Sequence, residues 1–169
     1  MKTIAIYPGS FNPFHIGHYN ILEKAERIFD DVIVAVGHNP SKPQTETYTV
    51  KNGEITIITD KPRHVVIGEV LHNRKVEGYS GYLTDYIKSI KDREDEEVRV
   101  VLIRGLRNGD DLDYEVNQLR ILEDMMSHDE LDVVFITCDK EYEHLSSTVC
   151  RQMELIRKNT SLIYYPTIK

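Results

Sequence analysis

The alternation of short apolar runs with helix-patterned segments constrains the fold of this chain more than any other feature of its sequence. Residues 3–7 form an apolar run that stops at Pro8-Gly9, and residues 32–36 form a second run. Between them, over residues 17–30, apolar side chains recur at the spacing of one helical face. A strand, a helix and a strand in this order predict a βαβ unit with parallel strands and a right-handed crossover.

The same alternation continues through the rest of the chain. Apolar runs predict two more core strands, at residues 98–103 and 133–137. Helical spacing predicts helices over residues 82–90 and 112–126, and a last helix that begins at Ser146 or Ser147 and ends near Lys158. Ligands of such a sheet bind beyond the carboxyl ends of its strands, so we expect the functional site there.

Two segments between the second and third predicted strands differ from this pattern. Asn52-Gly53 separates two β-patterned runs between residues 48 and 59, which predicts a tight hairpin inserted into the domain. Segment 62–72 fits a strand or a helix, and Asp60 as a cap with Pro62 in the first turn favours the helix. We therefore predict one α/β domain over residues 1–169, a Rossmann-like, doubly wound parallel sheet with an inserted β-hairpin near residues 48–59.

Composition excludes several classes of function. With 40% hydrophobic and 29% charged residues, the chain has the balance of a folded domain. Its net charge of −7 opposes broad binding to nucleic acid, which needs a basic face. No apolar run is long enough to span a membrane, the N-terminus does not resemble a signal peptide, and Cys138 and Cys150 lack disulfide or metal spacing. We expect a cytoplasmic protein without nucleic-acid or membrane partners.

Three polar segments each follow a predicted strand and precede a predicted helix, at residues 8–18, 104–111 and 137–147. In the first, His15-Ile-Gly-His18 places two imidazoles and a glycine at a helix start. Exposed N–H groups and the positive end of the helix dipole favour an anion there. Capping of the helix end by the two histidines is the simpler explanation, and the two explanations carry similar weight for this motif alone.

The other two segments point to the same chemistry. Arg104-Gly-Leu-Arg107 supplies two guanidinium groups, whose fork geometry suits phosphate, and Ser146-Ser147-Thr148 opens a helix. Taken singly, surface charge and ordinary capping explain both, but three such segments at strand ends indicate a phosphate site. The sequence has no G-x-x-x-x-G-K-[ST] and no G-x-G-x-x-G after the first strand, which opposes a P-loop ATPase and a dinucleotide dehydrogenase. No spacing of His, Cys or Asp indicates a fixed metal.

Residues 8–18, Pro-Gly-Ser-Phe-Asn-Pro-Phe-His-Ile-Gly-His, resemble the (H/T)-x-G-H signature of a nucleotidyltransferase superfamily. Within it, the chain resembles the phosphopantetheine adenylyltransferase family over residues 1–42 and 78–152. The supporting segments follow the family order: Phe29-Asp30, Asn39-Pro-Ser-Lys42, Arg104-Gly-Leu-Arg107, Asp111-Leu-Asp-Tyr-Glu115 and Leu145-Ser-Ser-Thr148. Their combination is far more specific than any one motif.

This resemblance implies a reaction in which ATP and 4′-phosphopantetheine give dephospho-coenzyme A and pyrophosphate. The acceptor phosphate would attack the α-phosphorus of ATP directly, without a covalent intermediate, and His18 would be the catalytic residue that stabilises the transition state. The resemblance also implies Mg²⁺ as a cofactor held mainly by phosphate oxygens and water, and assembly as a homohexamer. It implies no side chain as a metal ligand.

The same resemblance implies two overlapping sets of binding residues. The acceptor would be bound by Ser10, Lys42, Leu83 and Arg104. ATP would be bound by residues of the three strand-end segments, namely Ser10, Phe11, His18, Gly105, Leu106, Arg107, Glu115, Tyr142, Glu143, His144, Leu145, Ser146, Ser147 and Thr148.

The chain departs from the family pattern at four places. Asn12 stands where the family more often has Asp, Gln152 where Glu is usual, and Tyr142 where Trp is common. After Lys42, the chain lacks the usual F-[ST]-x-E-E-R helix start and carries the Asn52-Gly53 hairpin instead.

Two alternatives stay open. Leu145-Ser-Ser-Thr-Val-Cys-Arg151 is also close to the I-S-S-T-x-I-R pattern of nicotinamide or nicotinate mononucleotide adenylyltransferases. A catalytically silent nucleotide-binding protein is the other alternative. His18 together with Lys42, Arg104 and Arg107 opposes it, because binding alone does not need groups that act in the transition state. A cytidylyltransferase is disfavoured, because Arg-Gly-Leu-Arg is not its usual motif.

Overall fold

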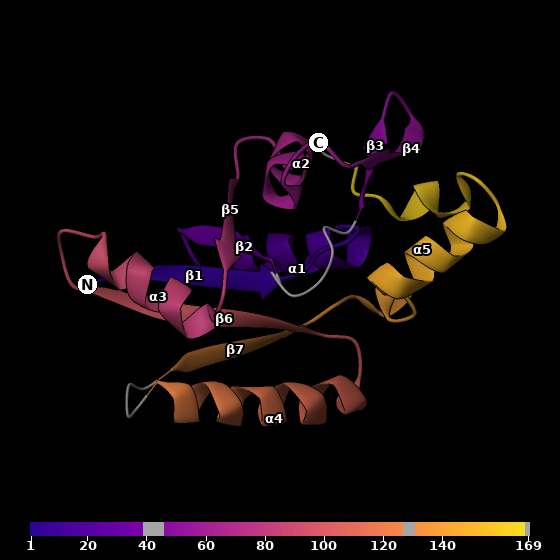
Figure 1. The fold of residues 1–169 in the computed structure, drawn as a ribbon. Helices are drawn as coiled ribbons and strands as arrows, with labels where there is room; N and C mark the ends of the chain where they lie inside the picture. Colours follow the sequence, from indigo (N-terminus) through magenta and orange to yellow (C-terminus); the bar gives the residue numbers. More distant parts are fainter. Residues whose placement is uncertain (39–45, 127–130, 168–169) are drawn as a thin grey trace.

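A computed structural model of the chain describes residues 1–38, 46–126 and 131–167. Its centre is a five-stranded sheet in the order β5-β2-β1-β6-β7, and every neighbouring pair is parallel (Figure 1). The strands are β1 (Lys2–Gly9), β2 (Val32–His38), β5 (Lys75–Ser80), β6 (Val98–Leu106) and β7 (Asp132–Thr137).

Helices cover both faces of this sheet. α1 (Ile16–Glu26) and α2 (Arg63–Val70) pack on one face, whereas α3 (Leu83–Asp92) and α4 (Gly109–Met125) pack on the other. Side chains alternate along β1, so that Ala5 and Tyr7 belong to the first core cluster and Ile4 and Ile6 to the second. The predicted α/β fold with a doubly wound parallel sheet is confirmed.

The strand order reverses between β1 and β6. From β1 the chain passes through α1 to β2 on one side, whereas β6 pairs with β1 on the other side. At such a reversal the connections leave in opposite directions and open a crevice beyond the carboxyl ends of the strands. Two of the polar segments singled out in the sequence begin there, after Gly9 of β1 and within the last residues of β6.

The predicted hairpin is also confirmed, as a separate two-stranded sheet of β3 (Thr47–Lys51) and β4 (Glu54–Ile58). Its turn residues Asn52 and Gly53 have φ angles of 54° and 76°, which is the backbone that the favoured two-residue hairpin turn requires. The hairpin lies beside α2 and the C-terminal part of the chain (Figure 1). There the Ile55 N–H donates to the Asn159 side chain at 3.1 Å.

Several boundaries differ from the predicted ones. β5 was not predicted, and it completes the sheet at the edge beyond β2. α1 ends at Glu26 rather than near residue 30, and α4 starts at Gly109, because Asn108 caps it by accepting from the Asp111 N–H at 3.1 Å. Segment 62–72 contains the favoured helix, α2, but the N-cap of this helix is Pro62 rather than the predicted Asp60. The last helix is α5 (Ser147–Ile156). None of the described helices is both long and apolar enough to cross a membrane.

Candidate active site

The start of α1 is built by its own two histidines. His15 is the N-cap, and its Nδ1 accepts hydrogen bonds from the N–H groups of Gly17 at 3.1 Å and His18 at 3.4 Å. In return, the His15 N–H donates to Nδ1 of His18 at 3.2 Å, so the two imidazoles form a reciprocal capping box. A Cβ on Gly17 would lie 3.0 Å from the His15 ring, which explains why a glycine separates the histidines.

Both imidazoles are neutral near pH 7. Burial lowers the pKa of His15 to about 4, with the Arg107 charge adding to the effect. Burial also lowers the pKa of His18 well below its usual value, and His15 and Arg107 act in the same direction. Since Nδ1 of each ring accepts a hydrogen bond, the single proton of each neutral ring is on Nε2. His18 is therefore a neutral N–H donor.

Phe11 supports His18 from within the protein. Its ring is 3% exposed and meets the edge of the His18 ring with 5.0 Å between centroids. Phe11 has a φ of 46°, and a Cβ on Gly9 would lie 2.7 Å from its ring. The close approach of this ring thus requires the glycine at the end of β1.

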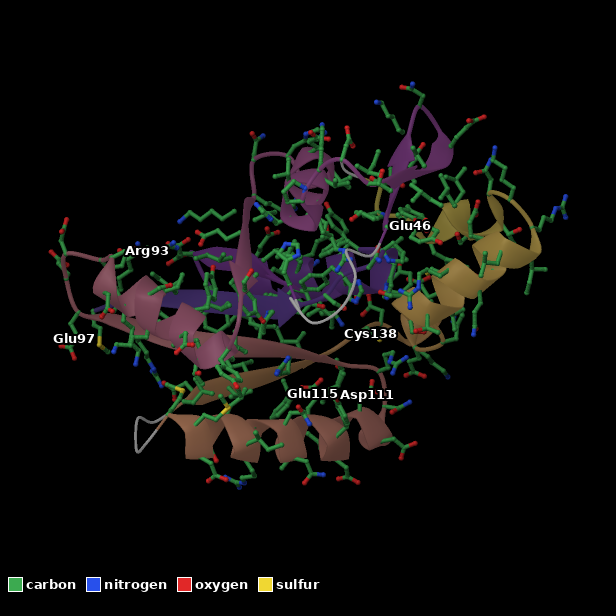
Figure 2. The ribbon with its side chains drawn as sticks, viewed as in Figure 1. Glu46, Arg93, Glu97, Asp111, Glu115 and Cys138 are labelled. Carbon is green, nitrogen blue, oxygen red and sulfur yellow. The ribbon has the colours of Figure 1, made fainter. Side chains whose placement is uncertain are left out.

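The end of β6 presents two arginines, each paired with a carboxylate of α4. Arg107 donates through Nε and Nη2 to the Asp111 carboxylate at 2.9 and 2.8 Å, and its backbone N–H donates to the same group at 2.8 Å. This pairing holds the pKa of Asp111 below its usual range. One turn further along α4, Glu115 meets Nε of Arg104 at 3.1 Å, and both side chains are mostly buried. Figure 2 shows Asp111 and Glu115 extending from α4 toward the sheet.

The start of α5 completes the site. Ser146 caps this helix by accepting from the Val149 N–H at 3.1 Å, and the Ser147 hydroxyl donates to the Pro13 carbonyl at 2.9 Å. The Arg107 guanidinium also donates to the Leu145 carbonyl at 3.4 Å. These bonds join the segments that follow β1, β6 and β7 into one unit.

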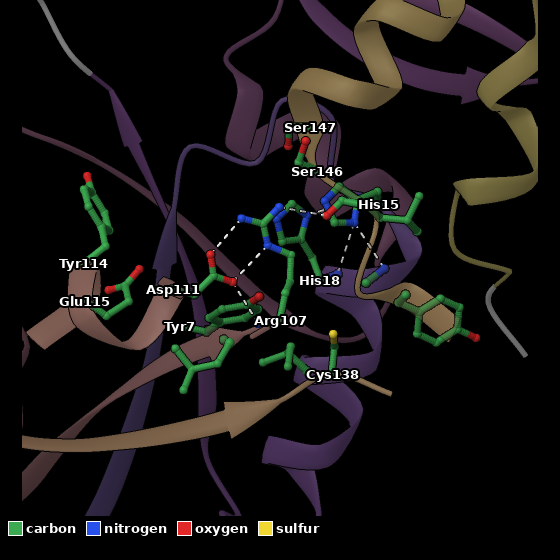
Figure 3. Close-up of a pocket in the computed structure, with 16 residues that line it drawn as sticks. Tyr7, His15, His18, Arg107, Asp111, Tyr114, Glu115, Cys138, Ser146 and Ser147 are labelled. Atoms are coloured by element: carbon green, nitrogen blue, oxygen red, sulfur yellow. Dashed lines mark hydrogen bonds and ion pairs between the residues drawn. The ribbon is translucent and has the colours of Figure 1, made fainter. Parts of the chain in front are cut away.

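These three segments enclose a pocket of about 270 Å³ (Figure 3). Nine of the residues implied for ATP line it: His18, Gly105, Leu106, Arg107, Glu115, Tyr142, Leu145, Ser146 and Ser147. Residues without an implied role also line it: Tyr7, His15, Gly17, Ile21, Asp111, Tyr114 and Cys138. The other residues implied for ATP do not: Ser10, Phe11, Glu143, His144 and Thr148.

The residues that the resemblance implies for the acceptor do not line this pocket together. Lys42 lies outside the described residues. Leu83 begins α3 and packs against the core cluster on the opposite face of the sheet. Ser10 and Arg104 do not line the pocket, although Arg104 contacts its lining residue Glu115.

Sequence reasoning missed Arg63, which holds the segment after β1. Arg63 is 9% exposed at the start of α2, and its Nη1 donates to the Ser10 carbonyl at 3.2 Å. Burial lowers its pKa, and the nearby Arg151 charge adds to this. The sequence offers only a two-residue signal for it, because Thr59 and Arg63 have the spacing of the Thr and Arg in F-[ST]-x-E-E-R, whereas Lys61 and Pro62 stand at its two Glu positions.

The described residues contain no group of three or more His, Cys, Asp or Glu side chains that could hold a metal ion. Of the pocket carboxylates, Asp111 and Glu115 are engaged by arginines. Cys150 is 1% exposed in α5, and burial raises the pKa of its thiol to about 11, which agrees with a structural role for this side chain.

Comparisons with known proteins agree with this arrangement. The sequence model of the cytidylyltransferase-like family matches residues 6–153. Proteins named phosphopantetheine adenylyltransferase from Syntrophomonas wolfei and Leptospira biflexa are each 31% identical to the chain, over 90% of its length and 84% of theirs. A crystal structure of a candidate nicotinate-nucleotide adenylyltransferase from Vibrio parahaemolyticus has the same fold, with a TM-score of 0.59 and 18% identity over 99% of this chain and 95% of that one. The chain therefore belongs to the cytidylyltransferase-like family, beside relatives named phosphopantetheine adenylyltransferase, and is a nucleotidyltransferase.

Proposed function

We propose that the protein transfers the adenylyl group of ATP to 4′-phosphopantetheine and releases pyrophosphate. The observation that carries this proposal is the pocket itself, where neutral His18 and Arg107 lie between the N-terminal ends of two helices. Such ends favour phosphate groups. The names of the two curated relatives supply the acceptor.

In the proposed reaction, an oxygen of the acceptor phosphate bonds to the α-phosphorus of ATP, and the bond from that phosphorus to the bridging oxygen of the β-phosphate breaks. The Nε2–H of His18 donates to an α-phosphate oxygen and does so more strongly as negative charge grows in the transition state. Arg107 and the start of α5 bind the outer phosphates. No side chain attacks phosphorus, so positioning and electrostatic stabilisation supply the catalysis.

The acceptor phosphate would be bound by Lys42 and Arg104, with Ser10 near the reacting atoms and Leu83 beside the pantetheine arm. Arg104 forms an ion pair with Glu115, whose carboxylate oxygen lies 3.1 Å from its Nε. A guanidinium held in this way loses less conformational freedom when it binds a phosphate. Among the implied ATP residues, the pocket lining supports a nucleotide role for His18, Arg107 and Ser146 most directly.

Three further properties belong to the proposal. Mg²⁺ would enter as the complex with ATP, held by phosphate oxygens and water, since the carboxylates Asp111 and Glu115 are paired with arginines. The protein would act in the cytoplasm. Self-association is supported by α4, which has no buried residue and exposes large apolar side chains such as Ile121, and the family resemblance implies a homohexamer. Light scattering should then give six times the chain mass of 19.6 kDa.

The competing acceptor is nicotinamide or nicotinate mononucleotide, favoured by the Ser-Ser-Thr-Val-Cys-Arg151 pattern. In the structure, however, Arg151 binds the protein itself. It donates to the Asn12 carbonyl and, at 3.3 Å, to the Thr148 hydroxyl, and it does not line the pocket. The sequence also contains no Trp to stack on a pyridine ring.

Pyrophosphate release from ATP, measured with each acceptor in turn, tests the proposal. We expect kcat/KM for phosphopantetheine to exceed that for the mononucleotides by at least ~100-fold, equivalent to about 2.7 kcal/mol of differential transition-state binding. Comparable values, or the reverse order, would overturn the acceptor and keep the nucleotidyltransferase. No release with any acceptor would favour the catalytically silent alternative.

A further inference from the structure

We propose that Asn12 is a positioning residue that joins the inserted hairpin to the segment carrying the active-site histidines. Two departures from the family pattern, an Asn in place of Asp and the hairpin after Lys42, then have one physical explanation. This inference rests on the proposed function for the role of His18.

The side chain of Asn12 uses both ends of its amide on the hairpin. Nδ2 donates to the Glu46 carbonyl at 2.7 Å, and Oδ1 accepts from the Tyr48 N–H at 3.2 Å. Asn12 is 8% exposed, and Glu46 lies where the chain enters β3 (Figure 2). The Glu46 carbonyl and the Tyr48 N–H together need one donor and one acceptor, which an amide has and an ionised carboxylate lacks.

The backbone around Asn12 is held by side chains rather than by regular structure. The Ser10, Asn12 and Pro13 carbonyls each accept from a side chain, from Arg63, Arg151 and Ser147 respectively. These donors belong to α2 and α5, and the hairpin supplies the remaining contact through the Asn12 side chain. The position of this segment therefore depends on several elements that are far apart in the sequence.

A displacement at Asn12 would reach His18 through one neighbouring residue. Phe11 precedes Asn12, and its ring packs edge-on against the His18 ring with centroids 5.0 Å apart. The Phe11 ring is confined by Gly9 and by Tyr7, whose ring centroid lies 5.1 Å away. Because packed side chains transmit small shifts, the hairpin helps to set the position of the donor that acts in the transition state.

The decisive variant is Asn12→Asp, which restores the residue more common in the family. Its carboxylate can still accept from the Tyr48 N–H but faces the Glu46 carbonyl without a donor. We expect kcat to fall about 10- to 100-fold, since a displacement of about 1 Å near the reacting atoms costs about 100-fold. KM for ATP should stay within about threefold of the wild-type value, because the variant affects transition-state rather than ground-state contacts.

Asn52→Asp is the matched control, since it makes the same chemical change at the exposed tip of the hairpin, where Asp-Gly also favours the turn. The Asn52→Asp variant should leave kcat and KM for ATP unchanged. Asn12→Ala, which loses both bonds without adding charge, should be no worse than Asn12→Asp. An Asn12→Asp variant with wild-type kcat, or with only KM for ATP raised, would overturn the proposal.

A double-mutant cycle tests whether Asn12 acts through the hairpin. In a variant with residues 46–58 replaced by a short Gly-Ser linker, Asn12→Asp should cost no further activity, whereas additive losses would contradict the coupling. If the hairpin-replacement variant does not fold, hydrogen exchange in the full chain tests whether Asn12 holds the hairpin. Asn12→Asp should speed amide exchange in β3 and not in β1, and unchanged exchange would count against the proposal. Exchange needs no turnover, so failure of the proposed reaction in the wild-type protein would leave this measurement valid.

Discussion

The residues proposed to bind the nucleotide (the nucleotide side) and those proposed to bind the acceptor (the acceptor side) differ in how the chain positions them. Around the residues proposed for the nucleotide, long-range bonds such as Ser147 to Pro13 join the segments, but each segment is also shaped by contacts between residues a few positions apart. His15 caps the helix that bears His18, Arg107 pairs with Asp111, and Ser146 caps its own helix. On the acceptor side, Leu83 and Ser10 belong to distant elements, and Lys42 lies outside the described residues.

This difference explains why short motifs identify one side better than the other. Bonds between residues three or four apart form whenever the local sequence adopts a helix start, so the motif and its geometry come together. Residues 10–12 depend instead on contacts such as Arg63 with Ser10 and Asn12 with Tyr48, which require distant elements to dock. A residue in such a segment gains its role only through the fold.

The largest expected effect concerns the nucleotide side. His18→Ala should lower kcat about 10²–10³-fold, since it removes a donor aimed at charge that develops in the transition state. KM for ATP should change little, because Arg107 and the start of α5 still bind the outer phosphates of ATP in this variant. Steady-state kinetics with both substrates measures this, and an equal loss of ATP binding would show that His18 acts in binding or structure.

Arginine substitutions should separate the two sides. Arg107→Ala should reduce kcat/KM for ATP about 10- to 100-fold, the loss expected for charge-assisted bonds to phosphate, with a smaller effect on the acceptor. Arg104→Ala should instead reduce kcat/KM for the acceptor more than kcat/KM for ATP. Arg120→Ala is the control, because Arg120 lies exposed further along α4 in a pair with Glu123. If both pocket variants impaired the same substrate, the division of the site would be wrong.

Four of the five sheet strands could be predicted because each contains a run of apolar residues. β5 could not, because its sequence Lys-Val-Glu-Gly-Tyr-Ser is half polar, whereas the other edge strand, β7, contains the apolar run Val-Val-Phe-Ile. Its Gly78 is required by packing, since a Cβ there would lie 2.3 Å from the His64 ring. Only the docking of α2 beside this edge makes the glycine necessary, and single-sequence patterns do not contain that information.

The candidate site could also be predicted only in part from the sequence. The placement of His18, Arg107 and Ser146 in one pocket agrees with the roles that the resemblance implied, which stay predictions until activity is measured. Asp111 was part of a quoted motif, but its bonds to Arg107 became visible only when α4 was placed beside β6. The Phe11 side chain is buried against His18, and its expected contact with the substrates stays a prediction.

The smallest expected effect is on stability, and it uses the capping box of the nucleotide side. The folded-state pKa of His15 is about 4, below the value of about 6.5 expected when the chain unfolds. As pH falls below 6.5, the unfolded state binds a proton that folded His15 does not, so stability declines until about pH 4. His15 should therefore lower the free energy of unfolding by about 2 kcal/mol between pH 7 and pH 5, and the lowered pKa of His18 adds in the same direction.

His15→Asn isolates this contribution, because Asn also caps helices but does not titrate. Urea denaturation at pH 7 and pH 5 should show that the variant loses about 2 kcal/mol less than the wild-type protein on acidification. His72→Asn, which replaces an exposed histidine, should keep the wild-type loss. Carboxylates such as Asp111 also lose stabilising pairs in acid, but they do so equally in all three proteins. The difference between variants therefore reports the buried imidazole, and an identical loss in His15→Asn and wild type would mean that this ring is solvated and that the capping box does not hold it neutral.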